Sequence, residues 1–199
     1  MGTTVKKEDR RVRRTKKLLT QALTKLMAQK QLKEITVKEL TELADMNRGT
    51  FYLYYKDIFD MLEKTEISLF NSLDSILTEH ASQGAYTDIK HIMEDVFEFI
   101  SENRDMCQVL LSENGDISFL HRLNELVREK CRSFWFSHNM NSDGNNYEYS
   151  YSFCVFGCAG LIRAWLINQC AEPHETMAKL AENLLMRGLN IGNPGLAEV

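Results

Sequence analysis

The sequence predicts an all-α protein of about nine helices. Its 199 residues include only two prolines, Pro173 and Pro194, so the first 172 residues lack the strongest helix breaker. Apolar residues recur at three- and four-residue steps, as they do in helices that bury one face. They make up 44% of the chain against 26% charged residues, a balance that is typical of globular proteins and excludes a disordered chain.

Charge is distributed unevenly along the chain, and this predicts two domains. Residues 1–56 contain 14 Lys and Arg against 6 Asp and Glu, a net charge of +8. Residues 57–199 contain 10 against 22, a net charge of −12. Eight of the basic residues lie between Lys6 and Lys17. We therefore expect a nucleic-acid-binding domain over residues 1–56 and an acidic helical domain over residues 57–199.

The basic domain is expected to begin with a long helix and a short one. The long helix spans Arg10 to Lys30 and buries one apolar stripe, formed by Leu18, Leu19, Ala22, Leu23, Leu26 and Met27. A capping box, in which the side chains of Thr36 and Glu39 each satisfy the other's backbone N–H, starts the short helix from Val37 to about Ala44.

A third helix is expected to follow directly. Asp45 tolerates the left-handed backbone of a turn, and Asn47 is a good N-cap for a helix from Arg48 to about Tyr55. Two short helices joined by a tight turn form a helix-turn-helix, which presents its last helix to the major groove of DNA.

The remaining chain is expected to be helical apart from a break at Ser82–Gly84, a turn at Gly115–Asp116, a polar loop over Asn139–Asn146 and a frayed tail after Gly192. The expected helices are Asp57 (as cap) to His80, Ile89–Asn103, Arg104–Ser112, Ile117–His138, Tyr147–Cys170 and Pro173–Ile191.

The segment from Thr36 to Tyr55, and above all the run RGTFYLYYK over residues 48–56, resembles the DNA-binding signature of TetR/AcrR-family transcriptional regulators. The resemblance extends over roughly residues 10–62, and the C-terminal part is similar in layout to the Firmicutes-type effector domain of such regulators. This chain departs from the family pattern at four positions: Gln31, Asp45 where glycine is usual, Tyr54 where histidine is common, and Ile58 where lysine is frequent.

The resemblance implies a role for each matching residue. Three side chains would face base edges: Arg48, Thr50 and Leu53. Four would hold the phosphate backbone: Thr36, Tyr52, Tyr54 and Lys56. The arginines of the N-terminal arm would reach a neighbouring groove or neutralise phosphates. Phe51 and Tyr55 are expected in the core.

The helix from Tyr147 to Cys170 is apolar nearly all round, which predicts that two of its sides are covered. The resemblance implies a homodimer whose four-helix interface is built from this helix and the last one. The candidate interface residues are Gly157, Gly160, Ala164, Leu180 and Leu184. The alternative is that both sides belong to the core of a single chain.

A signal-sensing role for the C-terminal domain follows from the resemblance, with repression of transcription as the output. The signal is an unidentified small-molecule effector. The alternative is a DNA-binding regulator or activator of transcription that a partner protein controls. Aromatic and sulfur-containing residues that form either plain core or a ligand site are Phe97, Phe99, Met106, Cys107, Phe134, Trp135, Phe136 and Phe156. Plain core is the favoured interpretation. Arg163 lies within an apolar helix and is expected to be a buried charge that needs a partner.

Other chemistries find little support in the sequence. No phosphate-binding glycine loop, nucleophile elbow or recognisable carboxylate pair occurs, so we expect no enzymatic activity and no cofactor. Neither the histidines nor the EF-hand-like run Asn139–Gly144, which has Ser150 where a glutamate is needed, predicts a metal site. Cys154 and Cys158 are expected to be inert thiols rather than a redox sensor. With five scattered cysteines and no apolar run of membrane length, we expect a cytoplasmic protein without membrane contact.

Overall fold

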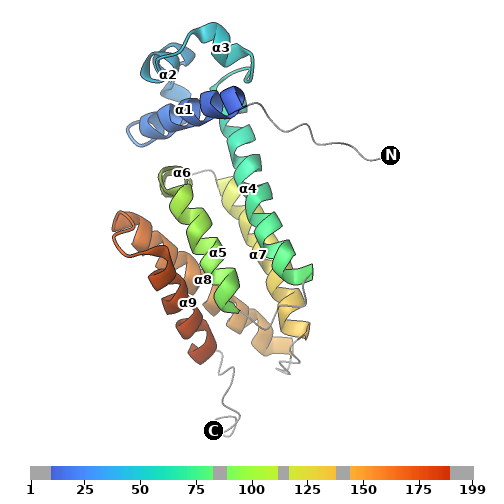
Figure 1. Cartoon of the computed structure of the whole chain (residues 1–199). Helices are drawn as coiled ribbons and strands as arrows, with labels where there is room; N and C mark the ends of the chain where they lie inside the picture. Colours follow the sequence, from blue (N-terminus) through green and yellow to red (C-terminus); the bar gives the residue numbers. More distant parts are fainter. Residues whose placement is uncertain (1–9, 83–88, 112–116, 138–143, 189–199) are drawn as a thin grey trace, which may run out of the picture. The chain divides into compact units, whose positions relative to one another are not determined.

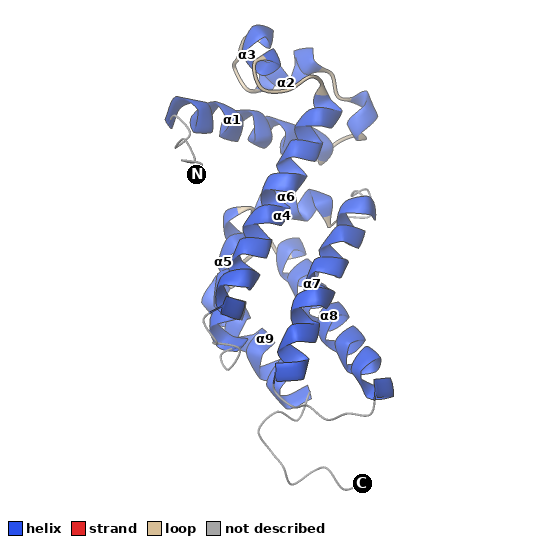
Figure 2. Cartoon of the chain, turned by 90° about the vertical axis from the view of Figure 1, so that its right-hand side faces the viewer, coloured by secondary structure: helices blue, strands red, loops and turns tan. Residues whose placement is uncertain are grey.

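The structure is a computed structural model that describes residues 10–82, 89–111, 117–137 and 144–188 (Figure 1). Within these ranges the chain forms nine α-helices and one short 3₁₀ helix, η1, and no strand (Figure 2). The prediction of an all-α fold is confirmed. The helices are α1 (Arg10–Met27), η1 (Leu32–Glu34), α2 (Val37–Leu43), α3 (Arg48–Tyr52), α4 (Ile58–Ser82), α5 (Ile89–Glu102), α6 (Arg104–Leu110), α7 (Ile117–Ser137), α8 (Gly144–Ile167) and α9 (His174–Gly188).

The chain divides into two compact units, residues 1–68 and residues 69–199. The division falls inside α4, which is one continuous helix. The domains expected from the charge distribution meet instead after residue 56, just before this helix begins.

The first unit is held together by apolar side chains from four helices. Those that are fully buried are Leu19 and Leu23 of α1, Leu40 of α2, Phe51 of α3 and Met61 of α4. Helix α2 packs against both α1 and α3. The stripe predicted for α1 is buried at Leu19, Ala22, Leu23 and Leu26, whereas Leu18 at its edge is 38% exposed.

The core of the second unit lies where α5, α8 and α9 pack together. The rings of Phe97 and Trp165 meet with their centroids 5.3 Å apart, and both side chains are buried. The indole N–H of Trp165 donates a hydrogen bond of 3.0 Å to the carbonyl of Glu172, which ties the turn between α8 and α9 to this core. Gln169 and Cys170 in that turn have φ angles of 58° and 51°, a left-handed conformation that non-glycine residues rarely adopt.

Four predicted helix boundaries are wrong by three residues. Helix α1 ends at Met27 rather than Lys30, and helix α8 ends at Ile167 rather than Cys170. Helix α8 begins at Gly144, so the end of the expected loop over Asn139–Asn146 is helical, and residues 139–143 lie outside the described residues. The third helix ends at Tyr52, three residues before its expected end. Because Tyr54 and Lys56 direct backbone groups to side chains of α4, the helix cannot continue through them.

Candidate nucleic-acid interface

Helix α2 begins at Thr36, as the sequence predicts. The Thr36 side chain accepts a hydrogen bond of 3.2 Å from the backbone N–H of Glu39, which satisfies one donor at the start of the helix. The carboxylate of Glu39 does not complete the expected capping box, because it pairs with the ammonium group of Lys30. Thr36 is exposed, so its hydroxyl lies at the surface beside the N-terminus of α2.

The turn between α2 and α3 is a Schellman turn built on Asp45. Its φ angle is 52°, which confirms the left-handed conformation expected there. Backbone N–H groups of Asp45 and Met46 donate to the carbonyls of Glu42 and Thr41, at 3.2 and 2.9 Å, and so close the end of α2. Two residues later the side chain of Asn47 accepts a hydrogen bond of 2.8 Å from the N–H of Gly49 and starts α3.

Helix α3 separates its side chains into a buried and an exposed set. Phe51 is fully buried and Tyr55, just beyond the helix, is 6% exposed, which confirms that both are core residues. Tyr52 is 58% exposed and Leu53 is 75% exposed, and Arg48 is exposed as well. Thr50 is half-buried. An aromatic and a large aliphatic side chain thus face the solvent beside a guanidinium group.

Positive charge adjoins this exposed set. The ammonium group of Lys16 in α1 lies 5.9 Å from the ring centroid of Tyr54, which is half-buried. Five further basic side chains of α1 are exposed: Arg10, Arg11, Arg13, Arg14 and Lys17. Lys56 is exposed on the connection to α4. A cluster of this kind attracts polyanions.

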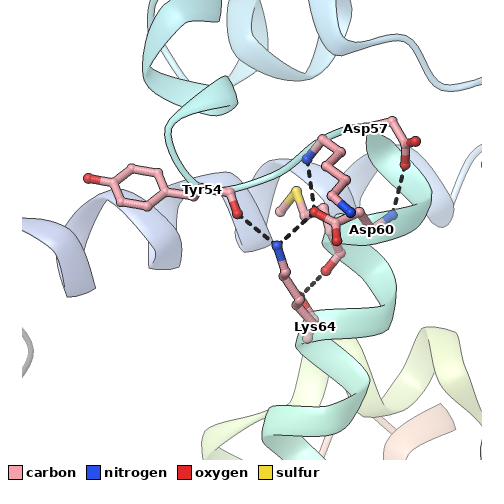
Figure 3. Close-up of polar contacts among 7 residues, drawn as sticks. Tyr54, Asp57, Asp60 and Lys64 are labelled. Carbon is pink, nitrogen blue, oxygen red and sulfur yellow. Dashed lines mark hydrogen bonds and ion pairs between the residues drawn. The ribbon is translucent and has the colours of Figure 1, made fainter.

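The connection from α3 to α4 is defined by polar contacts (Figure 3). Asp57 caps α4, as expected, by accepting a hydrogen bond of 2.8 Å from the backbone N–H of Asp60. Tyr54 and Lys56, on either side of Tyr55, therefore lead into a capped helix, and side chains of this helix form hydrogen bonds with their backbone groups.

Helices α8 and α9 expose an apolar surface. A β-carbon added at Gly157 or Gly160 would meet no atom within 4 Å, and Ala164 is exposed. Leu180 and Leu184 of α9 are 42% and 55% exposed. Phe153 of α8, which the sequence places on the same side as Gly157 and Gly160, is also exposed. Sequence reasoning did not assign two further exposed aromatic side chains of α8, Tyr149 and Phe156, to this surface.

The segment Glu148–Ile167 of α8 is long and apolar enough to cross a membrane by length and composition alone. Its mean hydropathy is 1.4, and only 22% of its most apolar stretch is buried within the chain. About half of the side chains in this segment are therefore exposed, although the other side of the helix, with Trp165 and Leu166, belongs to the core.

The aromatic and sulfur-containing set, for which plain core is the favoured interpretation, is only partly buried. Phe97 and Met106 are buried, and Phe97 belongs to the core, but Phe156 is 69% exposed. Arg163 is exposed, so the expectation of a buried charge is wrong. It lies three residues after Gly160 and four before Ile167, on the side of α8 that α9 leaves open. The side chains of Phe134, Trp135 and Phe136 lie outside the described residues.

Burial raises the pKa of the thiols of Cys154 and Cys158 to about 11. For Cys154, the neighbouring thiol of Cys158 raises the pKa as well, to a smaller extent. Both thiols are therefore protonated and weakly nucleophilic at neutral pH, as expected for inert cysteines. Among the described residues, no three His, Cys, Asp or Glu side chains are grouped closely enough to hold a metal ion.

Comparison with known proteins identifies the C-terminal part of the chain. Residues 87–187 match the family model described as a transcriptional regulator C-terminal region. Over 100 residues, the chain is 29% identical to the uncharacterized HTH-type transcriptional regulator YxbF of Bacillus subtilis (strain 168). That match covers 46% of this chain and 25% of YxbF, so the chain spans about a quarter of the length of this curated relative.

Solved structures of regulators share the fold. FadR from Bacillus subtilis, solved in complex with stearoyl-CoA, superposes with a TM-score of 0.63 at 15% identity, over 86% of this chain and 98% of that one. The dihydroxyacetone kinase operon activator DhaS gives a TM-score of 0.59 at 18% identity, over 89% and 97%. At such low identity, these likenesses concern the fold alone.

Replacing Asn47 with alanine removes the side-chain acceptor that starts α3. We expect the variant to lose about 1 kcal/mol of unfolding free energy, because the N–H of Gly49 then lacks its partner. Asn47→Asp keeps an acceptor at the same position and serves as the control. Urea unfolding measures both; equal losses in the two variants would show that the cap does not stabilise α3.

Proposed function

The chain belongs to the TetR family of transcriptional regulators, whose members bind DNA, and on this premise we propose that it is a homodimeric repressor. The dimer binds a pseudo-palindromic operator through two copies of α3, and a small-molecule effector releases it. The effector acts by favouring a spacing of the two α3 helices that no longer matches successive major grooves.

The observation that carries the DNA-binding proposal is the exposed side of α3. Burial of Phe51 directs Tyr52 and Leu53 into solvent, beside the exposed Arg48 and near the basic α1. Aromatic and large aliphatic side chains are usually buried, so two adjacent exposed ones on a short, capped helix indicate a binding surface. The basic residues beside this surface indicate that the partner it binds is a polyanion.

Each residue then has a place in the complex. The residues that read base edges are Arg48, Thr50 and Leu53, with Arg48 suited to the O6 and N7 atoms of guanine. The residues that hold the phosphate backbone are Thr36, Tyr52, Tyr54 and Lys56. The exposure of Thr36, Arg48, Tyr52, Leu53 and Lys56 supports these roles. The ring of half-buried Tyr54 lies 5.9 Å from the ammonium group of Lys16.

A second copy of the chain covers the apolar surface of α8 and α9. Gly157, Gly160 and Ala164 let two helices approach closely, and Leu180 and Leu184 flank them. The charged residues Glu148 and Arg163 within the membrane-length segment disfavour insertion into lipid, whereas the rim of a protein interface accommodates both. We therefore place this soluble dimer in the cytoplasm.

The chemistry of the effector is the least constrained part of the proposal. FadR of Bacillus subtilis, a neighbour in fold, was solved with stearoyl-CoA, which makes long-chain acyl-CoA the first class of compound to screen. The neighbour DhaS is an activator, so the direction of control is tested separately by transcription of a reporter gene with and without the protein.

The experiment that tests the function is a binding titration against the DNA just upstream of the protein's own coding region, at two salt concentrations. We expect tight binding to one pseudo-palindrome that weakens steeply as salt increases, because phosphate contacts release counterions. The same titration in the presence of candidate effectors detects release. If the upstream DNA binds no more tightly than random DNA, a selection of bound fragments from the whole genome follows, and sequence-specific regulation is excluded only if no fragment exceeds random DNA with or without candidate effectors.

Arg48→Ala is expected to relax discrimination at a single base pair of the operator, at a cost of about 1–3 kcal/mol for a bidentate contact. Binding to operators that differ at each position in turn measures this effect. Lys33→Ala removes the same charge from η1 and is the control, expected to weaken all operators slightly and equally. Unchanged specificity in the Arg48 variant would exclude a base contact.

Tyr52→Phe removes only a hydroxyl group and is expected to weaken binding to all DNA sequences by about 0.5–1.5 kcal/mol, since a phosphate contact carries no sequence information. A loss confined to one base pair would contradict the backbone role of Tyr52.

Gly160→Glu places a charge on the proposed interface without a clash inside the chain, because nothing lies within 4 Å of the added β-carbon. We expect a folded monomer with strongly weakened operator binding, measured by sedimentation velocity and the DNA titration. Gly160→Ala adds the β-carbon without the charge and is expected to stay dimeric. A stable dimer of the Glu variant would rule out this interface.

A further inference from the structure

Two side chains of the first turns of α4 hold the backbone that leaves α3 (Figure 3). The carboxylate of Asp60 accepts a hydrogen bond of 2.8 Å from the backbone N–H of Lys56 and another of 2.9 Å from the ammonium group of Lys64. Lys64 in turn donates to the carbonyl oxygen of Tyr54, at 3.0 Å. The same ammonium group lies 5.6 Å from the ring centroid of Tyr55.

We propose that Asp60 and Lys64, here called the α4 clamp, are positioning residues for DNA binding. They fix the peptide backbone of residues 54–56 so that the side chains of Tyr54 and Lys56 meet phosphates in the correct register. The inference rests on the proposed function, because it assigns the clamp a role only in a protein that binds DNA through these two residues.

The contacts fall on the groups that most need partners. The Tyr54 carbonyl and the Lys56 N–H lie between two helices, so the regular hydrogen bonds of neither helix include them. Both backbone groups are hydrogen-bonded to a single ion pair, that of Asp60 with Lys64, whose members are four residues apart on α4. Tyr55 between them is buried, which leaves the backbone on both sides little freedom to rotate.

The clamp residues are themselves held in place. The backbone N–H of Asp60 is bonded to the Asp57 carboxylate, so the residue is fixed at its main chain as well as at its side chain. The Asp60 side chain is only 16% exposed. The hydrogen bond from Lys64, followed by that from the backbone of Lys56, lowers the pKa of the Asp60 carboxyl group, which is therefore ionised at neutral pH.

The carboxylate of Asp60 lies close to residues that we propose bind phosphate. The direction in which its removal changes the affinity for DNA therefore distinguishes two interpretations. Electrostatics alone predict that removing a negative charge beside the DNA strengthens binding. A positioning role predicts the opposite, because the contacts of Tyr54 and Lys56 are lost or displaced. Glu63, an exposed carboxylate of the same helix, provides a matched comparison.

The experiment compares Asp60→Ala with Glu63→Ala in the full-length protein. The probe is a duplex selected from random DNA by the wild-type protein, so failure of the wild type to select any sequence rejects the proposed function and not the clamp. We expect Asp60→Ala to bind about tenfold more weakly than wild type, and Glu63→Ala to bind equally or more tightly. Equal or tighter binding by both variants overturns the inference.

Lys64 gives a second measurement, which holds even where Asp60→Ala fails to fold. Lys64→Arg keeps both donors and is expected to bind like wild type, whereas Lys64→Met weakens binding, and does so much less when Lys56 has already been replaced by alanine. If Lys64 instead contacts a phosphate directly, Lys64→Met weakens binding equally with and without Lys56→Ala, and the positioning role is rejected. Unchanged affinity of Lys64→Met rejects it as well.

Discussion

The burial of Phe51 is the constraint on which the DNA-facing surface depends. Helix α3 has five residues, and a helix of that length is unstable in water without tertiary contacts. Phe51 anchors it from within the core, and the ring of Tyr55 lies beside it with the centroids 5.5 Å apart. Since residues 51 and 55 are one turn apart on the buried side, Tyr52 and Leu53 have no other direction than solvent. The buried aromatic rings thus determine which side chains are available for binding.

Local features of this unit were predictable because residue type alone specifies them. Asn47 and Asp57 act as caps over two or three residues, and Asp45 takes a conformation that few residues tolerate. Contacts between residues nine or ten positions apart were not predictable. The pair of Lys30 with Glu39, which displaces half of the capping box, and the bond from Lys64 to Tyr54 exist only once helices have packed.

Helix α8 shows where periodicity stops being informative. Its sequence is apolar nearly all round, so the spacing of apolar residues correctly indicates two sides to be covered but does not say which side its own chain covers. The expectations for Arg163 and Phe156 failed for this reason: both lie on the side that α5 and α9 leave exposed. In contrast, Trp165 joins the core, because its indole N–H also finds an acceptor at Glu172.

The two proposed surfaces depend on different physical forces, and this separates their contributions. The α8 and α9 surface is apolar, so burying it against a second copy is driven by the hydrophobic effect, at about 25 cal/mol per Å², and is not weakened by salt. The α1 and α3 surface is basic, so its binding to DNA declines as salt increases. In the proposed dimer, each subunit offers one short helix to the DNA, and a single such contact is expected to be weak. Joining two of them through a salt-resistant interface would make the second contact intramolecular and raise the overall affinity. On this proposal, tight operator binding requires the dimer, whereas the dimer does not require the operator.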